Sequence, residues 1–198
     1  MKIGFGLTYG LMDNLEVGVY RINGTVERFD TYQFSGKLHA LRETDHRLDL
    51  AVLGGGTVFT IDDEEDDSGG FGSLLLGRSF SKYLYVSAGG LFHSNSSSFD
   101  KTGNDEEDST SVLGSVTAHL FPSLMLSGEF SVPVDGYEAN TTAWAGGVKF
   151  ETHGHTFSLV LGNTQYTSLD GLAAGTSFDS DEIVFGFSIT RAFELGGG

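Results

Sequence analysis

The stretch that decides the fold reads Ile183-Val-Phe-Gly-Phe-Ser-Ile-Thr-Arg191. Its bulkiest apolar side chains occupy every second position, at Ile183, Phe185, Phe187 and Ile189, with smaller or polar residues between them. Because successive side chains of a β-strand point to opposite faces, this alternation predicts a strand with one apolar face and one small, more polar face.

The same period of two runs along the rest of the chain, whereas the 3.6-residue period of an amphipathic helix is hard to find. The alternation predicts about eleven strands, at 2–9, 15–22, 26–41, 46–61, 71–80, 83–94, 110–121, 124–134, 142–152, 155–166 and 182–193. Many of them reach the roughly 9–11 residues that cross a bilayer at a tilt. Strands of soluble proteins are nearer five or six residues. The sequence therefore predicts an all-β chain.

The connections between the predicted strands alternate in length. The short ones are 10–14, 42–45, 81–82, 122–123 and 153–154, and the others, mostly long, are 23–25, 62–70, 95–109, 135–141 and 167–181. In an antiparallel up-and-down meander every second connection lies at the same end, so one end carries tight turns and the other carries polar loops. This asymmetry is typical of a transmembrane β-barrel with short periplasmic turns and long extracellular loops.

Acidic residues gather in the predicted long loops. The 198 residues include 27 Asp and Glu against 11 Lys and Arg, which gives a formal net charge of −16. Two acidic runs are candidates for attracting cations. They are Asp62, Asp63, Glu64, Glu65, Asp66 and Asp67, and then Asp105, Glu106, Glu107 and Asp108. Their spacing is not that of an EF-hand. A chain without a basic patch is not expected to bind nucleic acid, and a chain without Cys has no disulfide or thiolate metal site.

The apolar face of the predicted strands would meet lipid, because nothing else in the chain could cover so much Leu, Val and Phe. Aromatic residues near strand ends would form the interfacial girdle: Tyr9, Phe80, Tyr83, Phe121, Phe150 and Phe193. The candidate lumen-lining residues are Lys37, His39, Asp49, His119, Glu129 and Lys149. Arg78 is a further candidate, although Leu74, Leu75 and Leu76 blur the alternation beside it. Mixed charges in a narrow lumen either line a pore or pair and fill it, and the sequence leaves both open.

The number of strands bears on how the barrel closes. With the long loops outside, the first and last strands both run inward, so eleven strands leave the chain ends on opposite sides. Bacterial single-chain barrels have an even number of strands, and an open sheet edge in lipid is not viable. We therefore expect a single transmembrane β-barrel domain at 1–193 that lacks an N-terminal strand and a signal peptide, followed by a Gly-rich tail at 194–198.

Stretches near both ends of the chain resemble a known family. They are Gly4-Phe-Gly-Leu-Thr-Tyr-Gly10 with Asp13-Asn-Leu-Glu-Val-Gly18, and Glu151-Thr-His-Gly-His-Thr-Phe-Ser-Leu159 with Phe185-Gly-Phe-Ser-Ile-Thr-Arg-Ala-Phe193. They resemble a family of bacterial outer-membrane β-barrels known mainly as a domain of unknown function. The resemblance implies the barrel fold and further N-terminal sequence. It carries over no catalytic residue, because the family has no established reaction.

Together these features favour a small porin or channel of the bacterial outer membrane that prefers cations. Two alternatives stay open: a barrel with a plugged lumen whose acidic loops bind a surface partner, and a soluble ligand-binding barrel with the faces reversed. The chain has no Gly-x-Ser-x-Gly elbow, so we do not expect an enzyme. The expected partner is outer-membrane lipid, with divalent cations at the acidic loops and a surface protein as further candidates. We expect neither a cofactor nor a resident metal ion.

Overall fold

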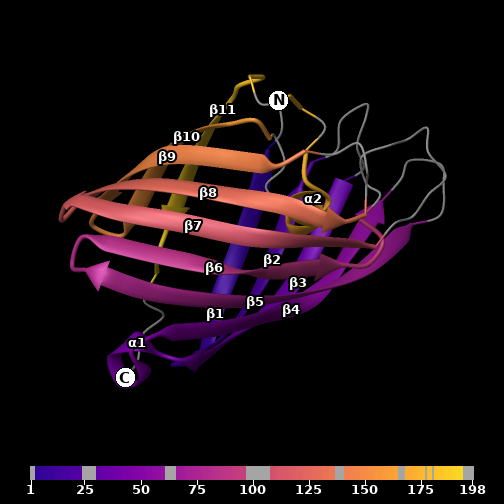
Figure 1. The fold of residues 1–198 in the computed structure, drawn as a ribbon. Helices are drawn as coiled ribbons and strands as arrows, with labels where there is room; N and C mark the ends of the chain where they lie inside the picture. The colour runs from indigo at the N-terminus through magenta and orange to yellow at the C-terminus, as the bar shows by residue number, and fades with distance from the viewer. Residues whose placement is uncertain are drawn as a thin grey trace.

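The computed structural model describes residues 3–23, 30–60, 66–96, 108–136, 141–164, 168–176, 178–179 and 181–193. These residues form one strongly curved sheet of eleven strands, in which each strand pairs antiparallel with the next along the chain (Figure 1). The strands are β1 (Gly4–Met12), β2 (Leu15–Ile22), β3 (Asp30–Leu41), β4 (Asp49–Thr60), β5 (Asp67–Ser81), β6 (Leu84–His93), β7 (Ser109–Phe121), β8 (Leu124–Asp135), β9 (Ala143–Thr152), β10 (His155–Gly162) and β11 (Val184–Arg191). The expected all-β, up-and-down architecture is thus confirmed.

The two ends of the sheet differ as the sequence predicted. The turns 13–14, 82–83, 122–123 and 153–154 lie at one end, together with the connection 42–48 that contains the short helix α1 (Glu43–His46). We call this the short-turn end. The remaining connections lie at the opposite, long-loop end, and the last of them contains helix α2 (Leu169–Ala174). Among the described residues, neither helix is long and apolar enough to span a membrane.

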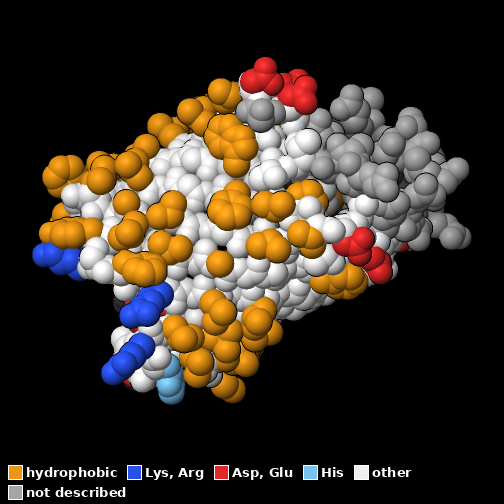
Figure 2. All heavy atoms as spheres, in the orientation of Figure 1, with side chains coloured by type: hydrophobic (Ala, Val, Ile, Leu, Met, Phe, Trp, Pro, Cys, Tyr) orange, Lys and Arg blue, Asp and Glu red, His pale blue; other side chains and the backbone are white. Residues whose placement is uncertain are grey.

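The register separates the side chains into an apolar outer face and a small, polar inner face. Phe187 stands opposite Leu159, and Leu159 opposite Val148. These side chains are 59%, 50% and 40% exposed, although they are large and apolar. On the inner face of the same three strands, Ser188, Ser158 and Lys149 follow one another. Figure 2 shows the hydrophobic side chains spread over the outside of the molecule, as the alternation predicts.

Charged side chains reach the outer face only near the ends of the described strands. Arg21, Asp30 and Asp135 lie at the long-loop end, where the Arg21 guanidinium is 2.6 Å from the Asp30 carboxylate. Arg78 and Arg191 lie toward the short-turn end. The middle of the outer wall is therefore uncharged, as a zone in contact with hydrocarbon must be.

Arg78 faces outward, so its prediction as a lumen-lining residue is wrong. Arg78 pairs with Val86 on the outer face, and its guanidinium lies 5.9 Å from the ring centre of Phe80. The alternation is blurred because Leu75 faces inward between two outward leucines. A run of three leucines gives no sign of which one faces inward.

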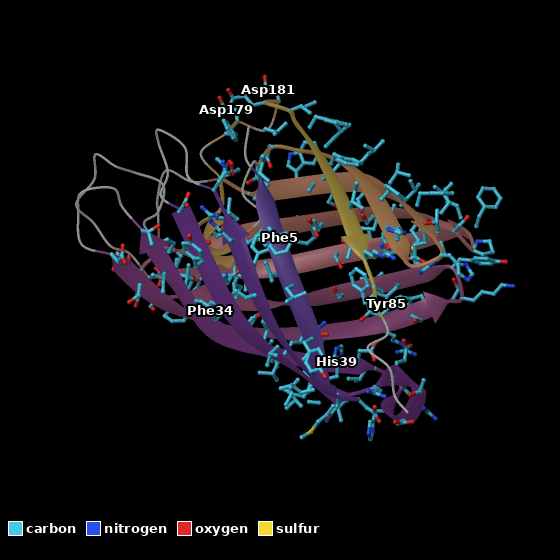
Figure 3. The ribbon with its side chains drawn as sticks, turned by 180° about the vertical axis from the view of Figure 1, so that it is seen from behind. Phe5, Phe34, His39, Tyr85, Asp179 and Asp181 are labelled. Carbon is cyan, nitrogen blue, oxygen red and sulfur yellow. The ribbon has the colours of Figure 1, made fainter. Side chains whose placement is uncertain are left out.

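The two edge strands, β1 and β11, are not paired with each other, so the sheet is not closed. Every residue of β1 is exposed. Both strands run from the long-loop end to the short-turn end (Figure 3). In an antiparallel meander all odd-numbered strands run in the same direction, so the first and the eleventh strands are parallel. One strand running the other way would be antiparallel to both edges.

Candidate functional site at the long-loop end

The connection between β10 and β11 folds into the barrel instead of extending away from it. Its helix α2 lies within the curve of the sheet, against β6, β7 and β8 (Figure 1). The side chains of Ala173 and Ala174 are fully buried there, and so is Asp170. The Ser131 hydroxyl on the inner face of β8 donates a hydrogen bond to the Leu172 carbonyl, with an O···O distance of 2.5 Å. Helix α2 therefore fills part of the lumen.

The segment that carries α2 is fastened at both of its ends. Before the helix, the Asn163 carbonyl oxygen Oδ1 accepts a hydrogen bond from Trp144 N at 2.7 Å, and Nδ2 donates to Thr142 O at 2.9 Å. After the helix, Thr176 and Thr141 exchange two backbone hydrogen bonds of 3.1 and 2.8 Å. The Thr176 hydroxyl also donates to Asn163 O at 3.0 Å. The two ends of the segment are thus tied to each other and to the start of β9.

Gly175 permits the sharp exit from α2. Its φ angle is +81° with ψ at −148°, a region that is open essentially to glycine alone. A Cβ atom at this position would lie 2.7 Å from Thr141 O and 2.9 Å from Pro133 Cγ. Any larger residue would therefore displace the end of α2 from the inner wall.

His93, at the end of β6 on the inner face, is a further ionisable side chain with no exposed surface. Its Nδ1 lies 2.7 Å from Ser94 O, and its Nε2 lies 3.0 Å from Thr57 Oγ1. Because a carbonyl oxygen can only accept, Nδ1 carries the hydrogen, and a neutral ring then accepts the Thr57 hydroxyl at Nε2. The ring stacks on Phe71 at 5.9 Å and is tilted against Phe59 at 6.3 Å.

Ser96, a described serine shortly after His93, is also used in packing. Ser96 Oγ lies 2.5 Å from Ser109 Oγ, and both residues are fully buried. Among the described side chains, no three His, Cys, Asp or Glu residues gather closely enough to hold a metal ion.

The structure brings the ends of the two acidic runs together at Asn95. The Asn95 side chain donates a hydrogen bond to Asp67 Oδ2 at 2.6 Å, and its backbone N donates to Asp108 Oδ1 at 3.3 Å. Asp66 is exposed beside them. The remaining candidates of the two runs lie outside the described residues: Asp62, Asp63, Glu64, Glu65, Asp105, Glu106 and Glu107.

The candidate lumen residues of β3 and β4 lie toward the short-turn end, where Figure 3 labels His39. Lys37 Nζ is 3.2 Å from Glu16 Oε1 on the neighbouring strand, with both side chains about one-third exposed. His39 pairs with Ala51 on the same face. Asp49 accepts hydrogen bonds from Glu43 N at 2.7 Å and from the Tyr85 hydroxyl at 3.2 Å.

The other three candidates lie on β7, β8 and β9. His119 and Lys149 stand on either side of Met125 in the register, and Glu129 stands opposite Ala145, further along β9. The register places all six candidates on the inner face. It spreads them over five strands from β3 to β9, so they do not converge on one site.

Sequence reasoning missed α2 and the polar contacts that hold it. The connection 167–181 was expected to be a long polar loop, whereas its Asp170 is fully buried in α2. A helix of this length is too short for its 3.6-residue period to show. The available signal was the small apolar run from Leu172 to Ala174 inside an otherwise polar loop. The structure also starts β5 at Asp67, four residues before the expected 71.

An antiparallel meander with an apolar outer face, an uncharged middle band and a small polar inner face has the architecture of the transmembrane β-barrels. The chain belongs to the family DUF5777, described as a membrane bound beta barrel domain, whose model matches residues 1–193. The protein is therefore a membrane β-barrel, as its resemblance implied, and the soluble-barrel alternative is wrong. Comparisons with curated proteins and with solved structures find no match.

Proposed function

We propose that this protein is a barrel of the bacterial outer membrane that is closed at its long-loop end and presents its acidic loops to a surface partner. The observation that carries the proposal is the position of α2, whose residues Asp170, Ala173 and Ala174 are fully buried inside the sheet. The outer membrane is favoured because short turns at one end and long loops at the other are typical of its barrels.

The way in which α2 is held supports a closed lumen. Water-filled channels need a continuous polar path, and here a packed helix contacts the inner face of β6, β7 and β8 at the long-loop end. The hydrogen bonds from Ser131 to Leu172 and from Thr176 to Asn163 are made inside the barrel. Opening the lumen would break them, so α2 acts as a plug and not as a surface loop.

The acidic loops give the closed barrel a surface to which a cationic partner can bind. Asp67 and Asp108 are brought together at Asn95, and Asp179 and Asp181 lie at the same end of the molecule (Figure 3). Figure 2 shows acidic side chains at this end and Lys and Arg at the opposite end. Such a field attracts cationic surfaces and repels anionic ones, which favours a basic protein partner or one bridged by divalent cations.

The second candidate is the cation-favouring channel, opened when α2 leaves the lumen. One observation favours it: toward the short-turn end the inner wall carries groups that remain partly exposed. Lys37 and Glu16 form an ion pair there and are each about one-third exposed. Removal of α2 would join this region to the acidic loops. The two candidates then differ only in whether the plug moves.

Conductance in planar bilayers tests the proposal. The refolded chain is compared with a variant in which residues 169–174 are replaced by a Gly-Ser segment of equal length. We expect no steady conductance from the unchanged chain and clear channels from the variant, because the replacement cannot pack on the inner wall. The control His153→Ser changes the turn 153–154 at the short-turn end, far from α2. The barrel of this variant should stay closed. Steady channels from the unchanged chain, unaltered by the replacement, would make the open channel the correct function.

A further inference from the structure

Cations on the outer face at the short-turn end lie over aromatic rings. The pairs and their distances to the ring centre are Arg78 with Phe80 at 5.9 Å, Lys82 with Tyr83 at 4.7 Å, and Arg191 with Phe193 at 4.7 Å. Two of these pairs are neighbours, since β5 carries Arg78 and the turn that follows it carries Lys82. An aromatic ring at the edge of an apolar wall marks the level of the lipid headgroups, and the cation above it reaches toward their phosphates.

Helix α1, at the same end of the molecule, carries a further cation and is fastened to β5. Both carboxylate oxygens of Glu43 accept the backbone N–H of Ser79 at 2.9 Å, which fastens α1 to β5 next to Arg78. The carboxylate of Glu43 is thereby occupied. Arg47 forms the C-terminal cap of α1, with a φ angle of +64°, and its side chain is exposed. We call Arg47, Arg78 and Lys82 the basic rim.

The basic rim borders the part of the outer wall that contacts hydrocarbon. Leu76, two residues before Arg78 on the same face, is 49% exposed, and Phe80, two residues after it, is 66% exposed. Among the described strands, the outer face carries no acidic residue toward this end, so the rim is not neutralised from that side. The described acids nearby are Glu43 and Asp45 on α1, and Asp49, which pairs with Gly77 beside Arg78 but faces inward.

We propose that the basic rim binds the headgroup phosphate of an anionic phospholipid in the leaflet at the short-turn end. A guanidinium and an ammonium held over rings at headgroup level match a phosphate in both charge and height. A phospholipid fits better than a protein partner because the rim is continuous with the lipid-facing wall. The inference rests on the membrane barrel that the family match establishes, and it is independent of whether the lumen is closed.

Native mass spectrometry of the full chain in a neutral detergent tests this proposal with two probes, dimyristoyl phosphatidylglycerol and dimyristoyl phosphatidylcholine. We expect the unchanged chain to retain the anionic lipid several-fold more than the zwitterionic one. The variant Arg78→Gln with Lys82→Gln should lose most of this preference, by roughly fivefold for each cation removed. Retention of phosphatidylcholine should not change. High salt should remove the preference of the unchanged chain, because it screens the phosphate from the rim.

The matched control is Arg21→Gln at the long-loop end. Arg21 also lies on the outer face over an aromatic ring, at 5.4 Å from the centre of Tyr32, but its guanidinium is already paired with the Asp30 carboxylate at 2.6 Å. Because this charge is neutralised, its loss should leave the lipid preference unchanged. The charge-preserving variant Arg78→Lys with Lys82→Arg should retain the preference and separates charge from misfolding. Equal retention of both lipids by the unchanged chain overturns the proposal. An equal loss in Arg21→Gln overturns it too, because the effect would then be one of total charge.

Discussion

Phe187 and Ser188 are neighbours in β11 that face opposite surroundings. Phe187 is 59% exposed on the outer wall, and Ser188 stands opposite Ser158 on the inner face. Phe187→Arg should lower the free energy of unfolding in lipid vesicles by about 2–4 kcal/mol, because it places a cation against hydrocarbon. Ser188→Arg should unfold nearly as the unchanged chain does in urea titrations. Equal losses at both positions would contradict the assignment of the two faces.

Gly175 makes a second prediction at the scale of one residue. Gly175→Val should lower the free energy of unfolding by about 1–3 kcal/mol, because the backbone conformation suits glycine alone and the side chain would meet Thr141 and Pro133. Hydrogen exchange should then speed up at the Leu172 amide, which donates to Ser168 O within α2. Gly72→Ala is the control, since a Cβ there would meet nothing within 4 Å. Unchanged exchange at Leu172 would show that α2 does not depend on this turn.

The elements differ in how far the sequence predicted them. Strands such as β11 were clear, because a lipid-facing wall forces a bulky apolar residue into every second position. The orientation of Arg78 could not be predicted from the leucines before it, because both faces of β5 are apolar there. Helix α2 was missed because its stability comes from contacts with strands distant in sequence, such as that of Ser131 with Leu172. The polar inner face was predicted, and the packing within it was not.

The difference between the two ends of the molecule predicts its orientation. For the proposed outer-membrane barrel we expect the short turns and the basic rim on the periplasmic side, and the acidic connections outside. Protease added to intact cells should therefore cleave the connection between β6 and β7, residues 94–108, and spare the turn 153–154. Lysed cells provide the control in which both sides are accessible. Cleavage of the turn alone in intact cells would reverse the orientation and move the basic rim to the outer leaflet.

The acidic end also predicts how an opened barrel would select ions. With residues 169–174 replaced, ions enter past Asp67 and Asp108, which hydrogen bonds hold together at Asn95. Their field extends over a screening length of about 10 Å at 0.1 M salt and about 3 Å at 1 M. The opened barrel should therefore prefer cations in dilute salt and lose this preference at high salt.

Reversal potentials in asymmetric KCl measure the effect, and charge removal locates its origin. Asp67→Asn with Asp108→Asn should lower cation selectivity while leaving the conductance at 1 M salt nearly unchanged, because it removes charge without narrowing the lumen. Glu129→Gln, on the inner wall of β8, is the comparison. If Glu129→Gln lowers cation selectivity more than the double Asp variant does, ions are selected inside the barrel. There the charges of Lys37 and Lys149 oppose those of the carboxylates. A preference for anions would show that these two lysines, and not the acidic loops, determine which ions pass.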